Sequence, residues 1–185
     1  MAVVEALLAL LEAGDAQPSM PRIAARAGVS LRSVFQHFAD REALYAAAAE
    51  RQQARIAALT PPLDPAAPLA ARAAALAAQR ARVFEVIAPV RRAALLMAPF
   101  SPVIATRLAT GRAGQRAEIA ALFAPELRAF APALRRGRTA ALATLCGFSS
   151  WDVLRVHQGL AVAAARRAVT EGILALLARP VARRR

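Results

Sequence analysis

The chain has 185 residues, 58% hydrophobic and 20% charged, so it can bury a core in one large domain or two small ones and is not disordered by composition. Its net charge of +13 lies wholly in residues 61–185, because six arginines balance six acidic residues in residues 1–60. Total charge therefore does not locate a nucleic-acid-binding region. Abundant alanine, with few β-branched or aromatic residues, predicts an all-α fold.

Membrane, export and catalytic signals are missing from the sequence. The longest uncharged runs, 93–106 and 139–151, are too short to span a bilayer, and no basic segment precedes the apolar residues near Glu5. The single cysteine, Cys146, is expected in the core. Two histidines and no paired-carboxylate, Ser/His/Asp or metal-ligand spacing predict a protein that is not an enzyme and takes no cofactor or metal. The lack of a membrane or export segment and the lone cysteine predict a cytoplasmic protein without membrane contact.

The first 38 residues predict three short helices. Apolar residues of 2–13 recur at helical spacing, and Gly14 and Pro18 end that helix. Ser19 is expected to cap a second helix, Gly28 to form a turn, and Ser30 to cap a third helix that runs to about residue 37. Val34 and Phe38 share the inward face of this third helix, and Leu31 and Phe35 border it. The opposite face carries Arg32, Ser33, Gln36 and His37, which is how a helix presents side chains to the major groove of DNA.

The remaining elements follow from caps and prolines. Asp40 is expected to cap a helix over 41–59, and four prolines in 60–68 mark a linker. Further helices are expected over 69–88, stopped by Pro89, and over 90–98, stopped by Pro99. One or two helices are expected over 103–123, then a loop with Pro125 and Pro132. The last predicted helices cover 138–157 and 161–178.

The segment IAARAGVSLRSVFQHFADREAL resembles the helix-turn-helix of the TetR family of bacterial transcriptional regulators. The resemblance is strong over residues 1–58. In the second half only the pattern of residues is similar, in 148–160 and in the helix that follows. It implies an N-terminal three-helix DNA-binding domain with its connecting fourth helix (1–59), a linker (60–68), and a helical effector-binding and dimerisation domain (69–185). It also implies a homodimer, a palindromic double-stranded operator, and repression released by a small, mainly apolar molecule.

The resemblance implies DNA contacts only at positions where this sequence has a residue that matches the family. Ser19 matches a capping position that often touches phosphate; Arg32, Ser33 and Gln36 match base-reading positions; His37 and Arg41 match backbone contacts. Ser30 and Leu31, at the start of the third helix, and Phe35 complete the candidate DNA-binding set. Phe35 is a departure, because tyrosine commonly contacts phosphate from that position. Ala161 is another, since a polar cap is often found there.

The effector site is predicted less directly. The large apolar residues best placed to line a pocket are Phe84, Met97, Phe100, Phe123 and Trp151. An alternative function is a dimeric small-molecule-binding module with weakened or absent operator recognition, because residues 1–60 have no net charge and Phe35 lacks a hydroxyl group. The mean hydropathy of +0.39 and the basic charge also leave open an amphipathic membrane-surface protein, which lipid-vesicle binding would test.

Overall fold

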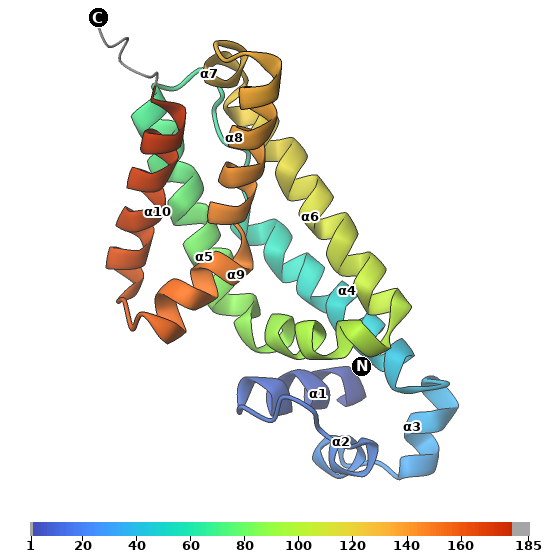
Figure 1. Ribbon diagram of the computed structural model, residues 1–185. Coiled ribbons are helices and arrows are strands. Elements are labelled where there is room, and N and C mark those ends of the chain that lie inside the picture. The colour runs from blue at the N-terminus through green and yellow to red at the C-terminus, as the bar shows by residue number, and fades with distance from the viewer. Residues whose placement is uncertain (1, 179–185) are drawn as a thin grey trace, which may run out of the picture. The chain divides into compact units, whose positions relative to one another are not determined.

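The computed structural model describes residues 2–178, except for the side chain of Ala54, and every regular element in that range is helical (Figure 1). The predicted all-α fold is confirmed. The helices are α1 (Ala2–Glu12), α2 (Met20–Ala27), α3 (Leu31–His37), α4 (Arg41–Leu59), α5 (Leu69–Met97), α6 (Pro102–Leu122), α7 (Ala124–Arg128), α8 (Pro132–Leu145), α9 (Phe148–Asp152) and α10 (Val162–Leu177). A 3₁₀ turn (Ala98–Phe100) follows α5, and a π-helical turn (Val153–His157) follows α9.

Three boundary predictions in the second half are wrong. Helix α5 does not stop at Pro89 but continues through it, although proline lacks the N–H for one helical hydrogen bond and its ring crowds the carbonyl four residues earlier. Buried residues on both sides, Ile87 and Val90 among them, keep the segment helical. The single helix expected over 138–157 is instead divided, because Gly147 is extended (φ −86°, ψ 160°) and separates α8 from α9. Pro132 begins α8 rather than interrupting a loop, as proline at a first helical position does.

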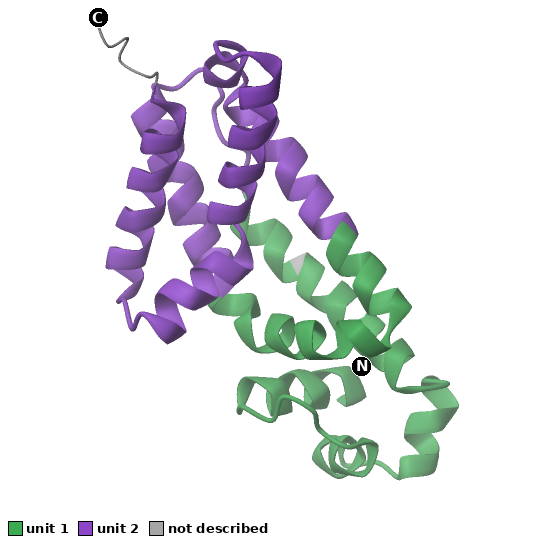
Figure 2. Cartoon of the chain, in the orientation of Figure 1, with its two compact units in different colours: residues 1–60, 85–109 green, residues 61–84, 110–185 purple. Residues whose placement is uncertain are grey.

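The described chain forms two compact units, coloured separately in Figure 2. Unit 1 contains residues 1–60 and 85–109, so α1 to α4 share a core with parts of α5 and α6. Its core includes Leu7, Ile23, Val34 and Leu44, all fully buried, and Ala93 from α5. The compact unit is therefore larger than the predicted segment 1–59, because the four N-terminal helices bury their apolar faces partly on α5 and α6.

Unit 2 contains residues 61–84 and 110–185, described to residue 178. Its α8 and α10 pack closely at Gly172, where a Cβ atom would lie 2.7 Å from Cδ2 of Leu145. Phe84 meets Phe148 edge to face, with ring centroids 5.7 Å apart. Cys146 is buried as expected, and burial raises the pKa of its thiol to about 12, so it is a core residue rather than a reactive one.

Candidate nucleic-acid interface

Two serine caps and one glycine shape the segment from Ser19 to His37. The amide of Arg22 donates to Ser19 Oγ at 3.4 Å, and the amide of Ser33 donates to Ser30 Oγ at 3.1 Å. Between the helices Gly28 has φ 68° and ψ 29°, a left-handed conformation that favours glycine. The amide of Val29 then donates to the carbonyl of Ala24 at 3.1 Å, which closes the turn. These contacts fix the direction of α3 relative to α2.

Helix α3 divides into the two faces that its sequence predicts. Val34 is fully buried in the unit 1 core, and Phe38, which follows the helix, packs against the same core. The side chains of Arg32, Gln36 and His37 are exposed, and Ser33 is half-buried. The structure therefore brings these four candidate residues together on one short helix, beside the exposed caps Ser30 and Ser19. Their DNA contacts stay a prediction.

Leu31 and Phe35 are more exposed than their expected border position suggests. Their exposed fractions are 39% and 48%, and they lie four residues apart, so they are neighbours on the outer side of α3. Apolar side chains on a groove-reading helix can contact the methyl group of thymine. The outer face of α3 thus offers an apolar pair as well as polar groups.

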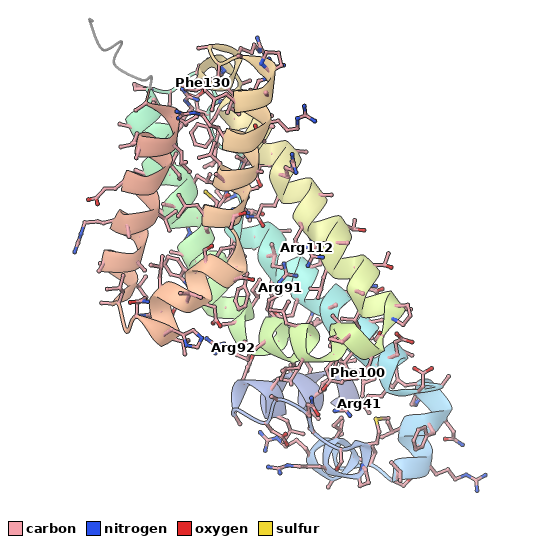
Figure 3. All side chains as sticks on the ribbon, in the orientation of Figure 1. Arg41, Arg91, Arg92, Phe100, Arg112 and Phe130 are labelled. Carbon is pink, nitrogen blue, oxygen red and sulfur yellow. The ribbon has the colours of Figure 1, made fainter. Side chains whose placement is uncertain are left out.

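The Arg41 side chain makes two contacts within unit 1, and its phosphate contact stays a prediction. Its Nη2 donates to the carbonyl of Pro18 at 3.2 Å, and its guanidinium lies 5.5 Å from the ring centroid of Tyr45 (Figure 3 labels Arg41). Pro18 directly precedes the Ser19 cap. Arg41 therefore ties the start of α4 to the start of α2, a role that the sequence pattern did not indicate because the contact spans 23 residues.

One helix start also has an acidic neighbour that the sequence did not predict. Asp15, in the loop after α1, pairs with Arg22 through Oδ2 and Nε at 3.1 Å. Arg22 is at the third position of α2, so an acid lies near that helix start although none is within its first turn. The first turn of α3 has no acidic residue, which leaves its free amides and positive dipole end suited to a phosphate group.

Ion pairs hold α4 within unit 1. Nε of Arg51 donates to Glu5 Oε1 at 2.8 Å and joins α4 to α1. Nη2 of Arg107 lies 3.2 Å from Oε1 of Glu50, and the hydroxyl of Ser101 donates to Glu42, so α4 is also joined to the start of α6. The helix that follows the candidate DNA-reading segment is therefore tied at several points along its length.

The five candidate effector residues do not form one group. Phe84, Phe123 and Trp151 lie in the core of unit 2, and the rings of Phe84 and Trp151 are 6.4 Å apart between centroids. Met97 packs on the core of unit 1, whereas Phe100 is 88% exposed (labelled in Figure 3). At this exposure Phe100 does not line an enclosed cavity. Their ligand-binding role stays a prediction.

Neither a metal site nor a membrane span emerges from residues 2–178. No group of three or more His, Cys, Asp or Glu side chains in that range could hold a metal ion. Within the same range no helix combines the length and the apolar character needed to cross a bilayer.

Comparison with known proteins gives a family match for part of the N-terminal half and a similar fold for nearly the whole chain. Residues 4–48 match the family model described as bacterial regulatory proteins, tetR family. Comparison with curated proteins gives no match. Among solved structures, the chain is similar to a transcriptional regulator from Rhodococcus sp. Rha1, with 21% identity, a TM-score of 0.71, and coverage of 95% of this chain and 94% of that one. It is also similar to the multidrug binding protein EbrR, crystallised with imidazole, with 23% identity, a TM-score of 0.66, and coverage of 99% and 97%. At these identities the likenesses establish the fold.

Proposed function

We propose that this chain, whose N-terminal domain belongs to the tetR family of bacterial regulatory proteins, is a sequence-specific DNA-binding regulator that represses transcription until a small molecule releases it. The observation that carries the proposal is the exposed face of α3, where Arg32, Gln36 and His37 stand outward while Val34 is fully buried beneath them. Side chains on one face of a helix that follows a glycine turn suit the major groove. In this role the protein acts in the cytoplasm and catalyses no reaction.

A homodimer is part of the proposal. The resemblance implies a homodimer, and in the region of 148–160 and the helix after it apolar residues are exposed: Val153 is 45% exposed, Val156 54% and Val162 37%. Exposed apolar patches commonly mark an interaction surface. A two-fold dimer presents two α3 helices, so its operator is a palindrome with half-sites about one DNA turn apart.

A weakened DNA reader is the second candidate function. Two phosphate contacts that the sequence resemblance implies are unsupported, because Phe35 lacks a hydroxyl group and Arg41 is engaged with Pro18 and Tyr45. Phosphate contacts position a protein on DNA and supply much of its affinity. A chain that lost both would keep its fold and its ligand response while reading DNA poorly.

Selection from random DNA separates the two functions. Purified full-length protein is incubated with a random library at physiological salt, and the bound fraction is sequenced over several rounds. The regulator proposal expects one enriched palindromic site whose binding is lost in a variant with Arg32, Gln36 and His37 all replaced by alanine. The matched control replaces the exposed arginines Arg82 and Arg112 and should select the same site. Enrichment of no motif, or of one that the triple variant still selects, would overturn the regulator proposal.

A further inference from the structure

A groove in unit 2 has an apolar floor and a rim of arginines, and the function proposed above does not use it. It is bordered by α6, α7 and α8 and has a volume of about 490 Å³. Its floor includes the buried Leu127 and the half-buried Ala124, and its rim carries Arg116, Arg128, Arg135 and Arg136. We refer to these six residues as the α6–α8 groove. In Figure 1, α7 and the start of α8 lie beside the end of α6.

The four rim arginines have no acidic partner among the described residues. The acidic residues on the bordering helices are engaged elsewhere: Glu126 pairs with the buried Arg72, and Glu118 pairs with Arg80. No carboxylate therefore lines the groove, and none forms an ion pair with its rim. Four like charges around one hollow repel one another and favour a bound anion.

The start of α8 adds hydrogen-bond donors to the same place. Pro132 lines the groove and is the first residue of this 14-residue helix. No side chain caps the helix start, since Ala131 is at the cap position. Pro132 has no N–H, so the amides of Ala133 and Leu134 are the ones without an acceptor within the helix, at the positive end of its dipole. Arginine forks and free amides both suit a carboxylate.

The apolar floor defines the other part of the ligand. Leu127 is 3% exposed, and Ala120 and Ala124 line the groove beside it, so most of the base is apolar. The hydroxyl of Thr139, which also lines the groove, donates to the carbonyl of Arg135 at 2.9 Å. A volume near 490 Å³ is that of a small-molecule site. We propose that the α6–α8 groove binds a small amphipathic carboxylate, with its acid group among the rim arginines and its apolar body on Leu127.

Calorimetric titration of the full chain with sodium octanoate tests the site, with octanol and inorganic phosphate as comparison ligands. The proposal expects saturable octanoate binding that weakens about tenfold or more in the R135A/R136A variant, because two charge-assisted donors are lost. Octanol and phosphate should both bind more weakly than octanoate at the same ionic strength. The R82A variant removes an exposed α5 arginine outside the groove and should bind octanoate like the parent. The thermal unfolding midpoint of each variant verifies that it is folded.

Several outcomes would overturn the proposal. These are no saturable binding of octanoate, an unchanged affinity in R135A/R136A, or equal binding of octanol or phosphate. No DNA is present in the titration, so its failure is separate from failure of the proposed DNA-binding function. A positive result leaves the effector role to be tested by adding octanoate to the protein bound to its selected operator.

Discussion

Arg32 is an exposed cation in the first turn of α3, where base contact is proposed. An arginine that binds guanine through two hydrogen bonds contributes about 1–3 kcal/mol of discrimination. We therefore expect Arg32→Ala to weaken binding of the selected operator by that amount per half-site and to leave random DNA nearly unaffected. Fluorescence anisotropy with both DNAs measures the difference. Equal losses on cognate and random DNA would contradict a base-reading role.

Phe35 offers a gain-of-contact test. Phe35 is 48% exposed and lies on the outer side of α3, away from the unit 1 core. We expect Phe35→Tyr to tighten operator binding by about 1 kcal/mol or less per half-site, because a tyrosine hydroxyl can donate to a phosphate oxygen. Phe35→Leu serves as the control without a donor. Operator affinity that does not rise in the tyrosine variant would show that this edge of α3 does not approach the DNA backbone.

Arg41 has a structural role that shows in stability. Loss of its hydrogen bond to Pro18 and its contact with Tyr45 should lower the free energy of unfolding by about 2 kcal/mol in Arg41→Ala. Arg26→Ala, which removes an exposed arginine of α2, should change it by less than about 0.5 kcal/mol. Urea unfolding measures both variants. If Arg41→Ala instead kept full stability and reduced the salt dependence of DNA binding, the side chain would be a phosphate contact, as the resemblance implied.

At the scale of elements, the turn between α2 and α3 depends on one backbone conformation. Gly28 has φ 68°, and a Cβ atom there would meet nothing within 4 Å, so a substitution is opposed by backbone strain alone. Gly28→Ala should therefore lower the free energy of unfolding by about 1–2 kcal/mol. Gly111 in the regular helix α6 has equally open surroundings, and Gly111→Ala should raise stability by about 0.5–1 kcal/mol.

Opposite signs for these two alanine substitutions are the expected result in denaturant unfolding. The same change of side chain is made in both, and only the backbone conformation differs. Destabilisation of similar size at both positions would show that the α2–α3 turn places no special demand on glycine.

At the scale of the whole molecule, the free energy of unfolding at acid pH should depend on the ion pair between Glu126 of α7 and Arg72 of α5, within unit 2. Hydrogen bonds from Arg72, itself 5% exposed, hold the pKa of Glu126 below its usual value of 4.5. A lowered folded-state pKa contributes stability that is fully present above pH 4.5 and is lost as pH falls through the folded-state value.

We therefore expect the free energy of unfolding to decrease below that pH, with a smaller decrease in Glu126→Gln, which cannot ionise. Glu126→Ala leaves the buried guanidinium without its partner and should cost about 3 kcal/mol at neutral pH. Urea unfolding between pH 7 and pH 3 measures both effects. An identical pH dependence in the parent chain and Glu126→Gln would contradict the assignment.

The sequence by itself determined the helical fold and the local form of α1 to α4. Capping serines, Gly28 and the spacing of apolar residues act within a few residues of one another, and their effects are readable without tertiary contacts. The two faces of α3 follow from the same short-range periodicity. Pro89 and the 138–157 segment were mispredicted because burial on either side decides whether a helix continues past a proline or divides at a glycine.

The tertiary structure alone decided which distant residues meet. It directed Arg41 to Pro18, placed Asp15 against Arg22, and brought parts of α5 and α6 into the unit 1 core. It also gathered four arginines from three helices around Leu127 while pairing the neighbouring carboxylates elsewhere. Such contacts join residues far apart along the chain. They depend on how whole helices pack, which no local pattern of side chains specifies.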